Sequence, residues 1–359
     1  MINRKKAQER LQDLVNQGKS QGVKLLQHLR DNIPKDYKVP HNKLDFRCTG
    51  IKWDSVKLEV GGGGGLSLHR NALSQICQKA GVPKKYADTL LADGQADLLA
   101  HNLYNRFHRM VPGKRGEIPT FLVREVNGEV RGFLSDRYKR WDSCGIIEAF
   151  TGVAGAVRAV PVQASALDTK FFLKVVMDKI FDVGKDLFLF GVCLRHSDFG
   201  DGALSLMSYI TRLVCNNGML GDDKFRKIHL GARIDDNVDL SERTYQLDSQ
   251  TMISAVKDIT SAMLNEDMVA VKLQRIKEAQ ERVIDATEKL QVLRKSSKIT
   301  KPEEEKISEL YRSAEVELLP PGNSVWRLSN AVSLFAQDVE PARGLELESL
   351  AGSLIGMAA

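Results

Sequence analysis

Cations and aromatic residues alternate without a gap at one point of the chain, in the run Arg137, Tyr138, Lys139, Arg140 and Trp141. In proteins that bind single strands, phosphates contact the cations while unpaired bases of any kind stack on the rings. Asp136 and Asp142 bracket the run, so local salt bridges are the competing interpretation. We take the run as a candidate groove for single-stranded nucleic acid.

A β-hairpin is predicted just before this run, with strands at Thr120–Val126 and Glu129–Ser135. Asn127-Gly128 between them suits a two-residue type I′ turn, because both turn positions need a positive φ. Such a turn pairs the last residue of the first strand with the first residue of the second. Counting back from it places Arg124 directly opposite Arg131, on one face of the hairpin.

The opposed pair Arg124 and Arg131 is a second candidate site. Like charges that face each other across two strands destabilise a sheet unless something neutralises them. A phosphate would do so, since arginine can donate two parallel hydrogen bonds to it. The alternative is that Glu129, diagonal on the same face, or a remote carboxylate pairs with one of the arginines. The two interpretations have equal weight at this point.

Two further basic groups extend the candidate surface. One precedes the hairpin and would prolong its groove if it lay on a mobile loop; it consists of Arg106, Arg109, Lys114 and Arg115. The other follows Asn216-Asn217-Gly218 and comprises Lys224, Arg226, Lys227, His229 and Arg233. Strand alternation places Arg226 on the face opposite Lys227, which divides the charge, so this second group is a secondary candidate.

An enzyme is the main alternative, because acidic residues gather near glycines at His196–Asp201 and at Asp222-Asp223. Paired carboxylates can hold metal ions for phosphodiester chemistry. Asp and Ser beside Gly are also common in ordinary turns for backbone reasons. The chain lacks a nucleophile with an adjacent base and orienting group. We therefore expect no catalytic residues, no metal site and no cofactor.

The elements that must position these residues follow from periodicity and turn signals. Helices are predicted over residues 1–32, 69–81, 86–105 and 204–215, and strands over 44–60, 171–176 and 187–194. From Ser249 to Ser296 the pattern is strongly helical, with a heptad seam from Ile276 to Leu293, and Thr300 to Glu305 begins a further helix. Two seam positions are alanine, which favours packing within the chain over an intermolecular coiled coil.

These elements predict an α+β fold with an antiparallel sheet, covering helices and a helical C-terminal section. We divide the chain into a basic N-terminal helical region and hairpin at 1–60, an α+β core at 66–245 and a helical section at 246–359. Charge follows this division. Residues 1–60 hold 13 Lys and Arg against 7 Asp and Glu, whereas residues 240–359 hold 15 against 19. Such asymmetry is typical of a protein whose basic N-terminal part binds a polyanion while its acidic C-terminal part has a different role.

Composition favours a cytosolic protein without membrane contact. No apolar run approaches the roughly 20 residues that span a bilayer, and the polar, basic start does not resemble a secretory signal. The cysteines are odd in number, far apart and without a Cys-x-x-Cys pair, which indicates reduced thiols; they are Cys48, Cys77, Cys144, Cys193 and Cys215.

Five segments, in order, resemble a family of phage- and plasmid-borne proteins catalogued only as a domain of unknown function. They are Ala72–Gln75 with Gly81–Tyr86, Phe121–Arg124 leading to Arg131–Tyr138, Ser197–Gly200, Arg212–Met219, and Ser324–Trp326 with Asn330-Ala331. The family carries Asp-Asn after the Arg-Tyr block, where this chain has Trp141-Asp142-Ser143. The resemblance spans roughly residues 70 to 335 and implies a mobile-element protein in the cytoplasm of a bacterial host. The family is distantly similar to phage single-strand annealing proteins.

We therefore expect a homo-oligomeric protein of phage or plasmid recombination that binds and anneals single-stranded DNA. The helical section from Ser249 to Leu318, in the acidic last third where no DNA contact is expected, is the predicted region of self-association. A metal-dependent nuclease or nucleotide-processing enzyme is one alternative. A mobile-element protein that binds a host factor through its acidic helices is another.

Overall fold

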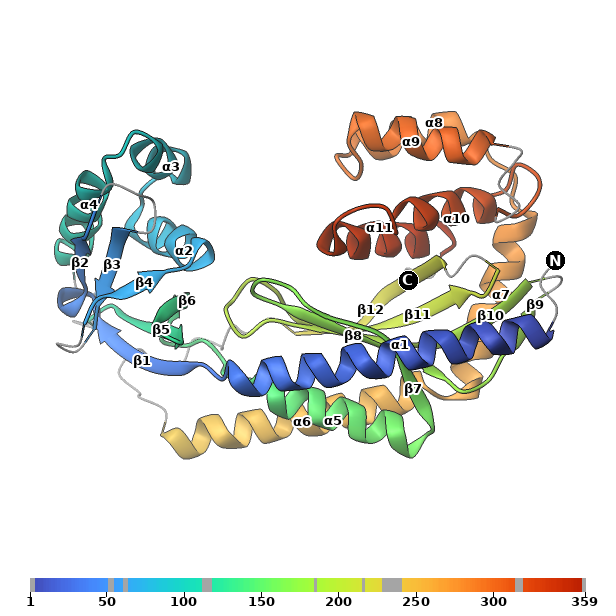
Figure 1. Ribbon diagram of the computed structural model, residues 1–359, viewed down its shortest axis with the longest axis horizontal. Coiled ribbons are helices and arrows are strands. Elements are labelled where there is room, and N and C mark those ends of the chain that lie inside the picture. Colours follow the sequence, from blue (N-terminus) through green and yellow to red (C-terminus); the bar gives the residue numbers. More distant parts are fainter. Residues whose placement is uncertain are drawn as a thin grey trace.

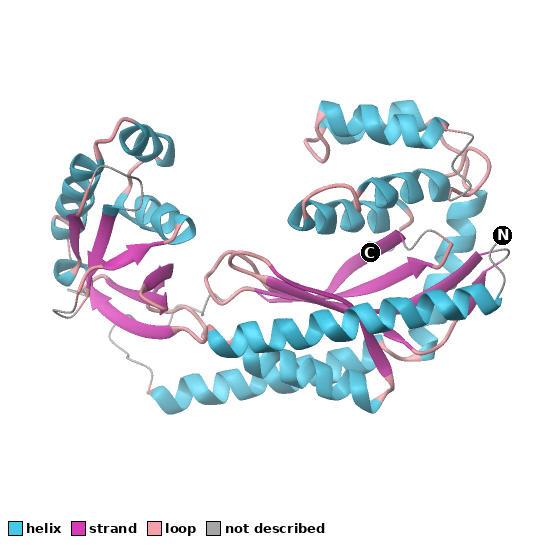
Figure 2. Ribbon diagram, viewed as in Figure 1, coloured by secondary structure: helices cyan, strands magenta, loops and turns pink. Residues whose placement is uncertain are grey.

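The computed structural model describes residues 4–50, 55–60, 64–111, 118–183, 186–214, 217–227, 241–313 and 319–356, without the side chains of 217 and 222–224. It contains two β-sheets covered by helices, followed by a helical C-terminal section (Figure 1 and Figure 2). The predicted α+β class is therefore confirmed. Within the described ranges, no helix is both long and apolar enough to cross a membrane.

The first sheet has six strands in the order β1-β5-β6-β4-β3-β2, and all neighbours are antiparallel except β4 and β6. Its strands are β1 (Lys35–Pro40), β2 (Asp45–Cys48), β3 (Val56–Glu59), β4 (Leu66–Leu68), β5 (Thr120–Val126) and β6 (Glu129–Ser135). The predicted hairpin is confirmed at both strands. Asn127 and Gly128 have φ values of 51° and 83°, as a type I′ turn requires.

The predicted pairing of Arg124 with Arg131 is wrong. Val126 pairs with Glu129 and Glu125 with Val130, but a β-bulge then shifts the register so that Arg124 pairs with Gly132. A bulge places two residues of one strand opposite one of its partner. Arg131 is the extra residue here, so the two arginines do not face each other.

Three helices cover the first sheet: α2 (Arg70–Ala80), α3 (Lys84–Ala92) and α4 (Ala96–His108). Gly81 ends α2 in the left-handed region at φ 66°, as predicted. The single helix predicted over 86–105 is interrupted, because Gly94 also adopts a positive φ between α3 and α4. Phe107 of α4 packs edge-on against Phe121 and Phe133 of the sheet, which anchors α4 in the core.

The second sheet has the order β12-β11-β10-β8-β7, with β9 beside β10, and every pair is antiparallel. Its strands are β7 (Ala159–Ala166), β8 (Phe171–Met177), β9 (Phe181–Val183), β10 (Asp186–His196), β11 (Leu204–Arg212) and β12 (Asn217–Lys227). The helix predicted over 204–215 is wrong, because β11 occupies most of it. A strand buried on both faces is apolar without alternation, and periodicity alone does not distinguish it from a buried helix.

Helices cover both faces of the second sheet. α1 (Arg4–Asp31) packs through Leu11 and Val15 on the face that carries Phe172 and Val176. α5 (Ser143–Ala156) and α6 (Glu242–Met263) cover the opposite face, which carries residues such as Leu173. In Figure 1 these three helices run along the length of the sheet.

The C-terminal section consists of α7 (Glu266–Glu281), α8 (Ala286–Lys295), α9 (Lys301–Arg312), α10 (Val325–Phe335) and α11 (Pro341–Leu354). The predicted start of α9 is confirmed by a capping box between Thr300 and Glu303. The heptad seam is not one helix, since Val283 is exposed between α7 and α8. Its other members are buried with Trp326 in one core, which confirms packing within the chain.

The two sheets do not follow the predicted division at residues 60 and 246. β1, β2 and β3 hydrogen-bond into the same sheet as β5 and β6, so the boundary after residue 60 cuts through a sheet. α1 belongs to the second sheet. Strand pairing joins segments far apart in sequence, and a division by composition does not detect it.

Candidate functional site

The segment Arg137–Trp141 lies between β6 of the first sheet and α5 on the second, so it connects the two halves of the molecule. Tyr138 is 4% exposed and Trp141 is 2% exposed. The Tyr138 hydroxyl donates to the carbonyl of Ser197 at 3.3 Å, and Trp141 Nε1 donates to Asp248 Oδ2 at 2.7 Å. Neither ring presents a face to solvent, so the predicted base stacking on these residues is wrong for this conformation.

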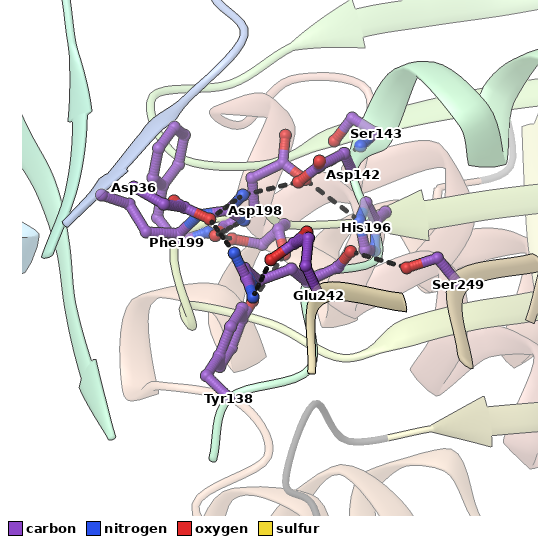
Figure 3. A network of polar contacts seen from close by, with 12 residues as sticks. Asp36, Tyr138, Asp142, Ser143, His196, Asp198, Phe199, Glu242 and Ser249 are labelled. Atoms are coloured by element: carbon purple, nitrogen blue, oxygen red, sulfur yellow. Dashed lines mark hydrogen bonds and ion pairs between the residues drawn. The ribbon is translucent and has the colours of Figure 1, made fainter. Parts of the chain in front are cut away.

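Arg124 is the centre of a polar network between the two sheets and is 1% exposed. Figure 3 shows Asp36, Asp142 and Asp198 of this network close together. Its Nε donates to Asp36 Oδ1 on β1 at 2.7 Å, and its Nη2 donates to Asp142 Oδ1 at 2.5 Å. Its Nη1 donates to the carbonyl of Asp198, after β10, at 2.9 Å. These partners accept the hydrogen bonds that Arg124 was expected to donate to a phosphate. The prediction that Arg124 binds a phosphate is therefore wrong for this structure.

The electrostatics of this network favour the charged forms of Arg124 and Asp198. Burial opposes ionisation of Arg124, but the charges of Asp142, Asp36 and Asp198 outweigh it and raise its pKa. Burial also opposes ionisation of Asp198, yet His196 and Arg124 outweigh it and lower the pKa of that carboxyl. Burial raises the pKa of Tyr138, so the phenol stays protonated. Burial raises the pKa of Asp142 against the opposing charge of Arg124, so this carboxyl is the member of the network that protonates most readily.

Lys139 and Arg140 of the run contact α6. Arg140 lies 3.2 Å from Glu242 and 3.5 Å from Asp36, and its guanidinium lies 4.4 Å from the centre of the Tyr245 ring. Lys139 forms an ion pair with Asp248. The carbonyl of Arg140 accepts from the hydroxyl of Ser249 at 3.0 Å (Figure 3). Arg137 is half-buried. Lys139 and Arg140 thus pair with carboxylates distant in sequence, on α6 and β1, whereas the competing interpretation of the run was local salt bridges with Asp136 and Asp142.

Arg131 is also committed to protein groups. Its Nε lies 3.1 Å from Glu129, and its Nη1 donates to the carbonyl of Asp168 at 3.3 Å. Its guanidinium lies 5.8 Å from the centre of the Phe199 ring. Gly132 beside it lets Phe199 approach, because a Cβ there would lie 3.3 Å from Phe199 Cα. Glu129, the alternative partner considered from the sequence, therefore neutralises Arg131.

The acidic turn after β10 also has structural partners. Asp198 Oδ1 accepts from the backbone N–H of Ser143 at 2.9 Å, at the start of α5, and lies 3.3 Å from His196 Nε2. Asp201 accepts from the hydroxyl of Thr169 and pairs with Lys170 at 3.2 Å. Among the described residues, no group of three or more potential ligands could hold a metal ion.

The other predicted cations are distributed differently. Lys114 and Arg115 lie outside the described residues, as do His229, Arg233 and the side chain of Lys224. Arg226 and Lys227 are exposed at the end of β12, which confirms the strand predicted there.

A different basic surface lies over α3 and α4, and we call it the α4 depression. Its volume is about 660 Å³, and none of its lining residues is acidic; they are Ala80, Gly81, Val82, Pro83, Tyr86, His101, Asn102, Asn105, Arg106, Arg109 and Met110. Arg106 and Arg109, expected on a loop, lie on and next to α4. Among the described ion pairs, neither arginine takes part in one.

The sequence of α4 produces this surface directly. Leu99, Leu103 and Phe107 repeat at a spacing of four and are buried against the first sheet. His101 and Asn105 repeat at the same spacing on another face of the helix, and Arg109 follows four residues later. His101 Nε2 and Asn105 Nδ2 lie 2.7 Å apart. The spacing of these polar residues is visible in the sequence and could have identified this surface.

Aromatic rings border the α4 depression. Tyr86 lines it and is 45% exposed. Tyr104, on a neighbouring face of α4, is 38% exposed and stacks on His108 with the ring centres 3.9 Å apart. Exposed rings beside cations that lack a carboxylate partner form the combination that the run at 137–141 was expected to supply.

Comparisons with protein-family models, with curated proteins and with solved structures found no match for this chain.

Proposed function

We propose that this protein binds single-stranded nucleic acid through the α4 depression. One observation carries the proposal: exposed Tyr86 and the cations Arg106 and Arg109 line a single concave surface of about 660 Å³ without any acidic lining residue. Phosphates would contact the two arginines through charge-assisted hydrogen bonds. Unpaired bases would stack on Tyr86, and stacking tolerates any base.

Preference for single strands follows from the chemistry of the rings. Bases in a duplex are stacked on each other, so an aromatic side chain reaches them only after unpairing. Asn102 and Asn105 add amide groups that can donate to and accept from exposed base edges. The resemblance to phage- and plasmid-borne proteins supports strand annealing during recombination as the biological use of such binding.

The experiment measures the anisotropy of labelled single-stranded and duplex DNA of the same sequence at several salt concentrations. We expect tighter binding of the single strand and an affinity that falls steeply as salt rises, through release of condensed counterions. Arg106→Ala combined with Arg109→Ala should weaken binding by about tenfold or more. Arg4→Ala is the matched control, because Arg4 is exposed at the start of α1, far from α4 (Figure 1).

Equal affinity for the duplex, or a double variant that binds like the Arg4→Ala control, would remove the α4 depression as the binding site. Strand annealing adds a second requirement, since aligned copies strengthen weak contacts through multivalency. We therefore propose self-association, and sedimentation with and without single-stranded DNA tests it. If the protein is a monomer under both conditions, it binds single strands but does not anneal them as an oligomer.

A further inference from the structure

Lys174 of β8 is 1% exposed, although it lies in an apolar layer. Strand alternation places it on the same face as Phe172 and Val176, which pack against α1. Lysine is almost never fully buried unless it is paired. This position therefore needs an explanation beyond strand formation.

Three acceptors surround the ammonium group of Lys174. Nζ donates to Gln163 Oε1 of β7 at 2.8 Å and to Glu348 Oε1 and Oε2 of α11 at 2.8 Å and 2.6 Å. The Tyr209 ring centre lies 5.0 Å away. Gly218 makes room for this arrangement, because a Cβ there would lie 2.7 Å from Glu348 Oε1 and 2.8 Å from the Tyr209 ring.

Stability alone does not account for the pair. Desolvating two charges costs about as much as their attraction returns, and apolar residues of similar volume commonly serve as well. Lys174 stays charged, because the charge of Glu348 raises its pKa against the opposing effect of burial. The pair places fixed polar groups within an apolar layer, where they can orient a bound molecule.

A cavity of about 330 Å³ adjoins the pair, between α1, the second sheet and the turn from α10 to α11. Its walls include the apolar side chains of Leu14, Val162, Phe172 and Leu345, while polar groups such as those of Gln163 and Glu348 form the larger part of its surface. Small-molecule sites combine such walls with a few polar groups, from about 300 Å³ upward. We propose that this cavity binds a neutral, planar molecule of nucleobase size, with Glu348 and Gln163 as its hydrogen-bonding partners.

The bonding state of the lining groups selects this chemical class. All three N–H groups of Lys174 are engaged, and no other Lys or Arg appears among the lining residues, so a phosphate or carboxylate finds no free cation there. The Glu348 oxygens keep lone pairs that can accept from ligand N–H groups. Gln163 Nε2 has no protein partner among the described residues and can donate to a ring nitrogen or carbonyl. A nucleobase offers both groups on one edge and flat faces for Phe172.

The test is calorimetric titration of the full chain with guanosine, adenosine, cytidine and uridine, and with the corresponding monophosphates. We expect at least one nucleoside to bind at least as tightly as its monophosphate. Glu348→Gln should weaken that binding by about tenfold, the loss expected for a hydrogen bond to a charged acceptor. Leu14→Trp should abolish it by filling the cavity, while Asn16→Trp, exposed on the same helix, should leave it intact.

Circular dichroism checks that each variant is folded. If Glu348→Gln is unfolded, the result for Leu14→Trp decides the test, because that change alters none of the polar groups of the cavity. The absence of binding by all four nucleosides would overturn the proposal. So would nucleoside binding that survives Leu14→Trp. Arg106→Ala should leave nucleoside binding unchanged, so failure at this cavity and failure at the α4 depression are distinguishable.

Discussion

Arg124 and Asp142 join the two halves of the molecule: the guanidinium leaves β5 of the first sheet, and the carboxylate stands at the start of α5 on the second. Asp36 and the carbonyl of Asp198 complete the ring of acceptors around Arg124. One side chain thus contacts β1, α5 and the end of β10. This contact therefore bridges the two sheets.

Replacement of Arg124 by Met should therefore destabilise the whole chain. The change keeps the apolar stem but leaves Asp36, Asp142 and Asp198 without the charge that compensates them. Breaking a buried ion pair from one side costs about 3 kcal/mol or more. Urea denaturation followed by circular dichroism measures this free energy.

Arg131→Met is the matched control, since Arg131 is on the same hairpin but is more exposed and pairs with a surface carboxylate. Its loss should cost about 1 kcal/mol or less. Similar losses for the two variants would contradict the central role of Arg124.

Tyr86→Ala should weaken single-strand binding without changing its salt dependence. Loss of one stacked base costs about 1 to 3 kcal/mol, which corresponds to an affinity roughly 5- to 150-fold weaker. Arg106→Ala should instead reduce the slope of log affinity against log salt by about 0.7, because one phosphate contact is lost. Anisotropy titrations at several salt concentrations separate the two effects, and Tyr86→Phe should restore the affinity. A slope altered by Tyr86→Ala would argue against stacking.

Gly18→Ala and Gly22→Ala, both in α1, should have opposite effects. A Cβ at Gly18 would lie 2.4 Å from the carbonyl oxygen of Pro161, a backbone atom of β7, so the helix would have to move. Such overpacking costs about 1 to 3 kcal/mol. A Cβ at Gly22 meets nothing within 4 Å, so alanine there should stabilise by roughly 1 kcal/mol through helix propensity. Thermal unfolding measures both, and stabilisation by Gly18→Ala would mean that α1 does not pack so closely on β7.

Glu303 should contribute to stability at neutral pH and lose that contribution in acid. Hydrogen bonds from Arg343 and from Thr300, against a smaller opposing effect of burial, lower the pKa of Glu303 from 4.5 to about 2. A folded-state pKa below the unfolded value stabilises the fold above pH 4.5, and this stability is lost as the pH falls toward about 2. Glu303→Gln should therefore be destabilising at pH 7 and flatten the acid limb of the stability curve. Glu305→Gln, exposed on the same helix, should change neither, and equal effects of the two would refute the assignment.

Local signals in the sequence determined several elements. Asn127-Gly128 specified a type I′ hairpin because few residues accept positive φ at both positions. Gly81 ended α2 for the same reason, and Thr300 with Glu303 began α9 because the two side chains satisfy each other's backbone donors. Each signal acts over two to four residues, so the element can be predicted without knowledge of the rest of the chain.

Tertiary structure alone decided which candidate residues face solvent. The run Arg137–Trp141 has the composition of a nucleic-acid groove, yet α6 and the end of β10 cover its rings and pair its cations. The covering residues come from segments up to about a hundred positions away, and no local pattern records them. The bulge that separates Arg124 from Arg131 and the burial of β11 on both faces have the same origin. Strand registers and layer contacts form between distant segments, where the free energy of packing outweighs local preference.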